Sequence, residues 1–311
     1  MGVSRGQADG PTAATRPCSC AAKHVIFTEM RRRIIATIQH RIEQGGPVVV
    51  LTGAGISAAS GIPTFRGPEG FWTIGAREFT PEEMATRRMF QENPEAVWQW
   101  YLYRLGLCRN AAPNTAHLAV AAIEAHLRDR FLLITQNVDG LHLRAGSTPA
   151  RTFQIHGNIA YARCARDCDA TAHPLPEWVR PKARDERLSR AEIDALRCER
   201  CGSHLRPHVL WFDESYNETY YRFNSAVNAA METDVLITVG TSGATNLPLQ
   251  VGRLAAAGGA YLVDINPAPN PFSEMAVQTG GAFLEGDATD ILPELATAVA
   301  GDRRTDAPSG G

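Results

Sequence analysis

Val48 to Gly67 reads VVVLTGAGISAASGIPTFRG. The stretch begins with an apolar, β-branched run, which predicts a strand buried on both faces of a sheet. Gly53 and Gly55 follow directly, and a glycine pair after a buried strand lets backbone amides approach a pyrophosphate without a Cβ in the way. The stretch therefore predicts a nucleotide site, with Arg66 as a candidate phosphate ligand.

The glycine pattern departs from the common dinucleotide fingerprint. That fingerprint is G-x-G-x-x-G, followed about 20 residues later by an acidic residue that contacts a ribose. Here the glycine after Gly55 is Gly61, and the next predicted strand comes much later than that spacing requires. A tight turn without a ligand, with Arg66 in a surface ion pair, is the alternative interpretation of this stretch taken alone.

Four apolar runs predict the strands of a parallel sheet, at 48–52, 131–135, 234–239 and 260–265. Helices are predicted between or after them, as crossover connections require, at 114–128, 216–232, 247–257 and 291–299. A further amphipathic helix is predicted at 29–43. Because ligands bind beyond the carboxyl ends of such strands, the polar and glycine-containing loops that follow them predict a composite nucleotide site.

Two segments interrupt this alternation, one helical and rich in aromatic residues, the other rich in charges and cysteines. The expected fold is a Rossmann-like, doubly wound parallel sheet with a smaller, discontinuous zinc-binding and helical domain. The large domain is assigned to 29–67, 113–158 and 207–299. The small domain is assigned to 68–112 and 159–206. Residues 1–25 and 300–311 are predicted to be disordered extensions.

The composition is that of an ordinary globular protein, with 311 residues, 44% hydrophobic and 21% charged. The net charge of −2 gives no reason to expect nucleic acid as a partner. The apolar runs are of strand length, so no membrane span is expected. Cysteine pairs at metal-like spacing favour a reducing cytosol, and we expect a cytoplasmic protein.

Four of the seven cysteines form two close pairs, Cys164-x3-Cys168 and Cys198-x2-Cys201, separated by 29 residues. Four thiolates in two pairs suit tetrahedral Zn²⁺, and a site filled by sulfur is closed and structural. The gap is longer than the roughly 15–20 residues of a standard zinc ribbon. A nucleic-acid-binding ribbon is the alternative role, although acidic residues offset the arginines around the cysteines.

Taken together, the motifs resemble the sirtuin family. The matching segments run in family order and are Gly53–Ser57, Ser60–Pro63, Phe65–Gly67, Thr135–Asp139, Leu141-His142, His156-Gly157, the four cysteines and Gly240–Ser242. The resemblance implies an NAD-dependent protein-lysine deacylase, a transferase that consumes NAD and gives nicotinamide and O-acyl-ADP-ribose. It also implies structural Zn²⁺ and acyl-lysine proteins or peptides as substrates.

The resemblance also implies roles for individual residues. His156 is the expected general base for a ribose hydroxyl, and Asn137 and Asp139 are the other expected catalytic residues, which hold the nicotinamide amide and the ribose. The expected NAD contacts are Gly53, Ala54, Gly55, Ile62, Phe65, Arg66, Trp72, Gln136, Asn137, Val138, Asp139, Gly240, Thr241, Ser242, Asn266 and Ala288. Ile56 to Arg66 is expected to form a mobile flap over the nicotinamide.

Tyr101-x-x-Arg104 resembles the pair with which class III sirtuins bind the carboxylate of succinyl- or malonyl-lysine. Thr64, where most sirtuins carry aspartate, also matches that class. The expected substrate contacts are Tyr101, Arg104, Val209, Trp211 and Phe212. The alternative is that Tyr101 and Arg104 are surface residues one helical turn apart.

The sequence departs from the family at Phe212-Asp213-Glu214, where the family usually has Phe-Gly-Glu, and at Gly243–Pro248. Asp213 is expected to alter or narrow the groove in which the substrate pairs as an added strand. Three alternatives stay open: a general lysine deacetylase, a mono-ADP-ribosyltransferase or NAD hydrolase on the same scaffold, and a non-enzymatic binder of NAD or nucleic acid.

Overall fold

The computed structural model describes residues 2, 19–64, 80–184 and 186–300. Three predicted NAD contacts, Phe65, Arg66 and Trp72, lie outside the described residues, as does most of the predicted C-terminal extension. The helix predicted at 29–43 is longer than expected: α1 spans Ser19–Glu43, so the predicted N-terminal extension is helical from residue 19. The high helix propensity of Ala and Lys at 21–23 accounts for this difference.

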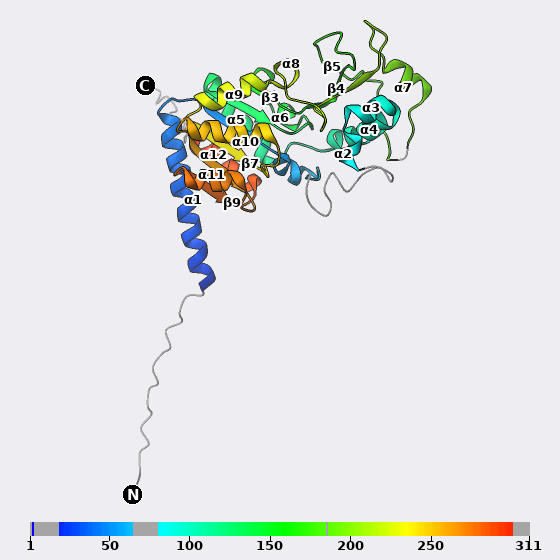
Figure 1. The fold of residues 1–311 in the computed structure, drawn as a ribbon. Coiled ribbons are helices and arrows are strands. Elements are labelled where there is room, and N and C mark those ends of the chain that lie inside the picture. The colour runs from blue at the N-terminus through cyan, green and yellow to red at the C-terminus, as the bar shows by residue number, and fades with distance from the viewer. Residues whose placement is uncertain (1, 3–18, 65–79, 185, 301–311) are drawn as a thin grey trace, which may run out of the picture.

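The large sheet is parallel throughout and has the strand order β3-β2-β1-β7-β8-β9. Figure 1 labels three of its strands, β3, β7 and β9, among the surrounding helices. Its strands are β1 Val48–Thr52, β2 Phe131–Thr135, β3 Thr152–Gln154, β7 Val235–Val239, β8 Tyr261–Asn266 and β9 Ala282–Glu285. This order is that of the doubly wound Rossmann fold, and it reverses direction between β1 and β7. The predicted fold class is confirmed.

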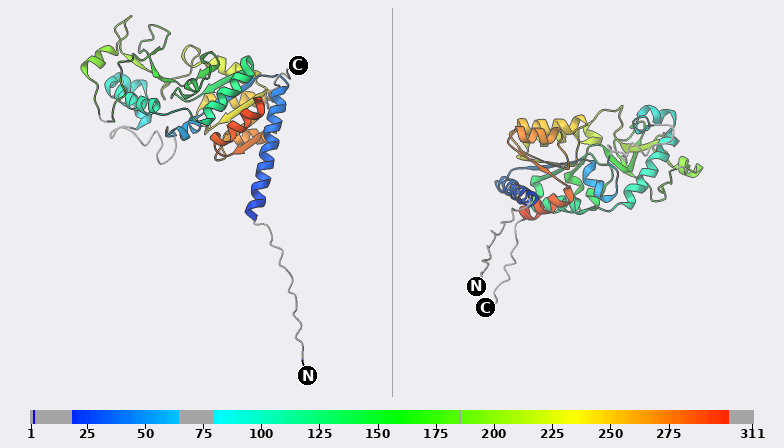
Figure 2. Two further views of the ribbon diagram at one scale, coloured as in Figure 1. Left: turned by 180° about the vertical axis from the view of Figure 1, so that it is seen from behind. Right: turned by 90° about the horizontal axis from the view of Figure 1, so that it is seen from below.

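Helices cover both faces of this sheet. The apolar stripe of α1 packs with α5 (Thr115–Leu127) and α12 (Ala288–Ala300) against one face. The opposite face is covered by α9 (Phe223–Glu232), α10 (Asn246–Ala257) and α11 (Pro271–Gln278). Figure 2 shows α10 and α11 on the other side of the sheet from α1 and α12. Val48 and Val50 face the first layer and Val49 and Leu51 the second, which is why the strand is apolar at every position.

The large sheet and its helices differ from expectation in three additional elements and in one helix that is divided. β3, β9 and α11 were not predicted, because the two strands are short and the helix follows a proline-rich turn. The single helix predicted at 216–232 is two helices, α8 Glu218–Tyr221 and α9. Arg222 separates them with a left-handed backbone (φ 54°), which interrupts the helical hydrogen bonds.

A second group of elements has its own apolar core. It contains α2 Pro81–Met84, α3 Arg87–Glu92, α4 Pro94–Asn110, α7 Arg190–Ala195 and an antiparallel sheet with the order β5-β4-β6. The strands of that sheet are β4 Gly157–Cys164, β5 His173–Pro174 and β6 Leu205–Val209. The small sheet therefore begins and ends slightly outside the predicted insertion 159–206, and the division into domains stays a prediction.

Short elements complete the described chain: η1 Ala54–Ser60, η2 Arg128–Arg130, α6 Leu141–Arg144 and η3 Pro149–Arg151. Within the described ranges, no helix combines the length and the apolar character that a membrane span needs.

Candidate active site

The loops that follow β1, β2, β7 and β8 meet at one edge of the large sheet. Gln136 after β2 donates through Nε2 to Oγ1 of Thr241 after β7, at 2.9 Å. Asn266 at the end of β8 donates to the carbonyl oxygen of the same threonine at 3.4 Å. The structure thus brings together Gln136, Thr241 and Asn266, three of the residues predicted to contact NAD, at the point where the strand order reverses.

Gly53 and Gly55 have a different role from the one predicted. Their amides donate to the carbonyl oxygens of Val239 and Gly240, at 2.9 and 2.8 Å, so these two amides are not free to bind a pyrophosphate. A Cβ on Gly53 would lie 2.7 Å from the Gly240 oxygen, and one on Gly55 would lie 2.7 Å from the Gly240 Cα. The glycines are needed because the two loops touch backbone to backbone.

The segment predicted to be a mobile flap starts as a helix. Ile56 and Ser57 are buried in η1, and Asn114 Nδ2 donates to the Ile56 carbonyl at 2.8 Å. Ala54 is half-buried and Ile62 is buried against the core of the small sheet. The first part of the flap is therefore a fixed helical turn, and its remainder from Phe65 lies outside the described residues.

Asn137 and Asp139 share a buried polar network with Ser57. Asn137 Nδ2 donates to Ser57 Oγ at 3.1 Å, and that hydroxyl donates to Asp139 Oδ2 at 2.8 Å. Burial raises the pKa of Asp139, against the hydrogen bonds from Leu141 and Ser57. Asn137 Oδ1 is buried and has no hydrogen-bond partner in the described part of the chain. An unsatisfied buried acceptor suits a ligand with an amide N–H, as nicotinamide has, so the residues fit NAD.

His117 extends this network and was not predicted as a site residue. Its Nε2 lies 3.3 Å from Ser57 Oγ, and burial lowers the pKa of His117 to about 4, so the ring is neutral. Its Nδ1 accepts from the backbone of Asn114, the N-cap of α5. An asparagine followed three residues later by histidine at the start of a predicted helix is the signal that could have revealed it.

Asn266 is held in place by the buried Asp264. The Asp264 carboxylate accepts from Asn266 Nδ2 at 2.8 Å, from Asn270 Nδ2 at 2.6 Å and from Thr238 Oγ1 at 2.6 Å. Sequence reasoning missed Asp264 because it lies inside an apolar strand. Of the other predicted contacts, Ser242 is exposed, Val138 is half-buried, and Ala288 is half-buried at the first residue of α12.

His156 lies between β3 and β4, at the junction of the two sheets. Its Nδ1 is 3.0 Å from the Gln136 carbonyl oxygen, which can only accept, so Nδ1 carries the proton and Nε2 is the basic nitrogen. Burial lowers the pKa of His156 to about 4, against the hydrogen bond to Gln136. The neutral imidazole at pH 7 can accept a proton at Nε2.

Tyr216 is a further residue at this point that the sequence did not reveal. Its hydroxyl is 2.7 Å from Nε2 of His156 and therefore donates to it. The ring of Tyr216 lies 5.8 Å from the imidazole and stacks on Phe223 at 6.2 Å. The residue stands in a loop without a recognisable motif, so no pattern in the sequence points to it.

Tyr101 and Arg104 are buried rather than on a helix surface, which removes the surface alternative. Arg104 is 2% exposed, and its guanidinium lies 3.3 Å from the centroid of the Trp100 ring. Burial lowers the pKa of Arg104 to about 9, so it is still a cation at neutral pH. Tyr101 accepts a 2.9 Å hydrogen bond from Trp211 Nε1. Because this bond uses a lone pair, the phenol proton can still be donated to a ligand.

The segment after β6 joins this pair to His156. Leu210 donates its amide to the His156 carbonyl at 2.9 Å, and Trp211 follows with its bond to Tyr101. Val209 is buried and Phe212 is 57% exposed.

The carboxylate of Asp213 contacts α3, and its effect on the substrate groove stays a prediction. Its carboxylate accepts from the backbone amides of Arg87 and Arg88, at 2.7 and 3.1 Å, in the first turn of α3. The neighbouring Phe212 amide donates to the Ala85 carbonyl at 3.0 Å. Asp213 therefore fastens the segment to α3, where its charge also favours the helix N-terminus.

Replacing Asp213 by alanine is expected to lower the free energy of unfolding by about 1 kcal/mol, the usual cost of a lost helix cap. Urea denaturation measures this change. Asp213→Asn keeps one acceptor oxygen and should recover part of the loss. Equal stability of all three proteins would show that these two hydrogen bonds contribute nothing.

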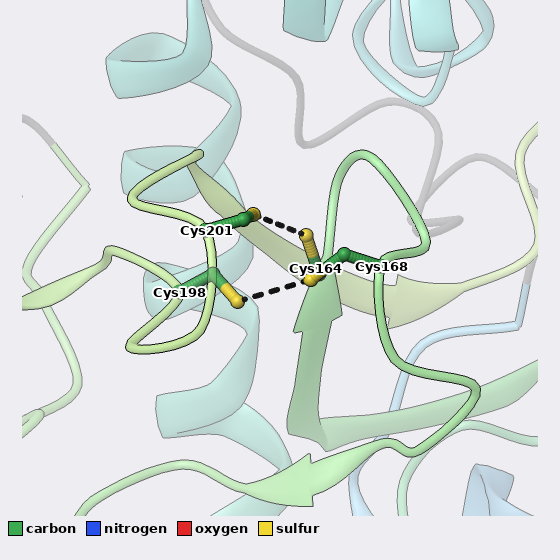
Figure 3. A group of neighbouring side chains, drawn as sticks. All are labelled: Cys164, Cys168, Cys198 and Cys201. Atoms are coloured by element: carbon green, nitrogen blue, oxygen red, sulfur yellow. Dashed lines mark hydrogen bonds between the residues drawn. The ribbon is translucent and has the colours of Figure 1, made fainter.

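The four predicted zinc ligands converge at the end of the small sheet. All four Sγ atoms lie within 4.8 Å of one another, with 3.5 Å between those of Cys164 and Cys201 and of Cys168 and Cys198 (Figure 3). A tetrahedral ion with Zn–S bonds of about 2.3 Å requires S···S separations of about 3.8 Å. Hydrogen bonds from Ser203 lower the pKa of Cys201 to about 6, whereas hydrogen bonds with Cys201 and Cys164 raise the pKa of Cys168, as expected for thiols that share one site. The residues fit a closed structural Zn²⁺ site.

Two buried arginines connect the cysteine cluster with the segment after β6. Arg163 pairs with Asp167, which lies between the first two cysteines, and lies 3.7 Å from Glu214. Arg206 also pairs with Glu214 and donates to the Val209 carbonyl at 2.8 Å. Glu214 thereby fixes the end of the candidate substrate segment to the zinc-binding sheet.

Comparison with known proteins agrees with this geometry. The profile of the Sir2 family matches residues 53–246. An NAD-dependent protein deacylase of Leptospira interrogans is 39% identical over 80% of this chain and 91% of its own. One of Thermus thermophilus is 41% identical over 81% and 92%. The solved complex of a Sir2 homolog with NAD superposes with a TM-score of 0.66 at 34% identity, over 81% of this chain and 88% of that one. The chain belongs to the Sir2 family.

Proposed function

We propose that this chain is an NAD-dependent protein-lysine deacylase with a preference for acidic acyl groups, succinyl and malonyl. The membership of the Sir2 family and the deacylase relatives support the general activity. The single observation that carries the acyl preference is the buried guanidinium of Arg104 beside the phenol of Tyr101.

A buried cation gains stability from an anionic ligand, because desolvation disfavours its charge. Desolvation by burial has the largest effect on the pKa of Arg104 and lowers it. Burial raises the pKa of the neighbouring Tyr101 above its usual value, so its phenol keeps the proton and can donate it to a carboxylate. An acyl carboxylate would add a negative charge and two acceptors beside the guanidinium.

NAD, when bound, supplies the ribose carbon at which the acyl oxygen displaces nicotinamide. In the proposed reaction His156 accepts the proton of a ribose hydroxyl at Nε2. Asn137 and Asp139 hold the nicotinamide amide and the ribose. Gln136 would contact the ribose, and the residues that would hold the adenosine half at the sheet edge are Gly240, Thr241, Ser242, Asn266 and Ala288. Val209, Trp211 and Phe212 contact the acyl-lysine peptide.

Arg104→Met is the test of the acyl preference. Loss of a charge-assisted contact is expected to lower kcat/KM for succinyl-lysine peptide by about 10- to 100-fold, with acetyl-lysine turnover changed by less than about 3-fold. Mass spectrometry of paired peptides incubated with NAD measures both rates. Arg109→Met, at an exposed position of the same helix, is the matched control.

If Arg104→Met loses succinyl and acetyl turnover equally, Arg104 stabilises the fold and does not bind the acyl carboxylate. If the wild type acts equally fast on succinyl and acetyl peptides, it is a general lysine deacetylase without an acidic-acyl preference. Transfer of labelled ADP-ribose to protein without deacylated peptide would favour the mono-ADP-ribosyltransferase.

A further inference from the structure

The basic nitrogen of His156, Nε2, already accepts a hydrogen bond within the protein. Nδ1 donates to the Gln136 carbonyl, so Nε2 offers the one lone pair of the neutral ring. Tyr216 donates its hydroxyl to that lone pair at 2.7 Å. Nε2 cannot accept a second good hydrogen bond in the plane of the ring, so Tyr216 and a ribose hydroxyl compete for the same position.

We propose that Tyr216 is a positioning residue that caps His156, holding the imidazole in its reactive orientation and leaving Nε2 only when the ribose of NAD arrives. The inference rests on the proposed role of His156 as the base. The phenol mimics the incoming hydroxyl as a donor at the same atom.

The position of Tyr216 in the chain suits a cap that can be displaced. The loop is fixed on both sides: Glu214 is paired with Arg206, and Asn217 caps α8 by accepting from the Tyr220 amide at 2.8 Å. Ser215 is exposed and Tyr216 half-buried. A short span between two anchors lets the tyrosine turn away without moving the substrate segment before it or the helix after it.

A second polar partner, Thr245, lies beside the hydroxyl of Tyr216. A hydrogen bond with Thr245 opposes the effect of burial, which raises the pKa of Tyr216 to about 12. Thr245 donates to Gln136 Oε1 at 3.1 Å and follows the Gly240–Ser242 loop. When the phenol leaves His156, it can therefore keep a hydrogen bond with Thr245. With this raised pKa the phenol is protonated, and hence a donor, at neutral pH.

Binding of ADP-ribose and of ADP to the Tyr216→Phe variant tests the cap. Only ADP-ribose carries the ribose that must displace the hydroxyl. Removal of one competing hydrogen bond is expected to tighten ADP-ribose binding by about 2- to 10-fold, while ADP binding stays unchanged. Calorimetry measures both, and phenylalanine preserves the stacking on Phe223. Tyr261→Phe, which removes a hydroxyl at the start of β8, is the matched control and should bind both ligands as the wild type does.

A double-mutant cycle separates this proposal from the role of His156 in catalysis. In a His156→Ala background, Tyr216→Phe should no longer alter ADP-ribose affinity. In steady state, Tyr216→Phe should lower KM for NAD by more than it changes kcat. Unchanged or weaker ADP-ribose binding, an effect that persists without His156, or a fall in kcat at constant KM would each overturn the cap. Deacylation that persists in His156→Ala would instead overturn the base assignment, and the binding cycle would still report on the cap.

Discussion

Replacing His156 by alanine is expected to lower kcat for every acyl-lysine peptide by about 10²- to 10⁴-fold, the usual contribution of a positioned general base. The Gln136 carbonyl fixes Nδ1 of this imidazole, so Nε2 is the nitrogen that can accept the proton. Peptide mass spectrometry with NAD measures the loss. His40→Ala, at an exposed position of α1, is the control for removing a histidine.

The role of His156 can also be tested by measuring kcat/KM of the wild type as a function of pH. Because burial lowers the pKa of His156 to about 4, the free base is present at all higher pH values. The limb of kcat/KM controlled by His156 should therefore fall as the pH decreases through about 4, rather than through 6.5. Deacylation within about 3-fold of the wild type in His156→Ala would show that another group accepts the proton.

Replacing Cys198 by serine is expected to remove the bound metal, unfold the β4–β6 sheet and abolish deacylation. Structural zinc contributes about 10–16 kcal/mol of apparent binding energy in isolated zinc modules, as much as the whole stability of a typical domain. The effect should reach the site, because Arg163 and Arg206 connect the cysteine end of the sheet to Glu214.

This prediction is checked in three ways. Metal analysis reports the bound ion, limited proteolysis within residues 157–209 reports unfolding of the small sheet, and peptide assays report deacylation. Cys20→Ser is the control for loss of a thiol outside the cluster. A metal-free Cys198→Ser protein that resists proteolysis and deacylates normally would show that the four thiols do not form a structural site.

The parts of the fold that could be predicted are those with a continuous apolar pattern. β1 and β2 begin and end where the sequence indicates, and β7 and β8 do so within one residue, because strands buried on both faces carry few polar residues. β3 reads Thr-Phe-Gln and gains its pairing from β2 alone. Such a strand forms because β2 lies beside it in the fold, and no local sequence pattern predicts that pairing.

The residues of the candidate site also fall into those that a sequence motif reveals and those that only the fold brings together. Asn137, Asp139, His156 and the cysteines stand in motifs with fixed spacing and could be found from the sequence. Tyr216 could not, because it depends on the fold bringing the loop before α8 against the strand end that carries His156. The glycines were found for the wrong reason: their amides bind carbonyl oxygens of the β7 loop rather than being open to phosphate.

That contact between Gly53, Gly55 and Gly240 has a consequence for how this scaffold diversifies. Where two loops touch through their backbones, there is no side chain to exchange, and any Cβ would separate them. This backbone contact at the proposed NAD site is thus closed to gradual sequence change. New acyl specificities in proteins built this way are expected to arise on α4 and in the loop after β6, where side chains make the contacts.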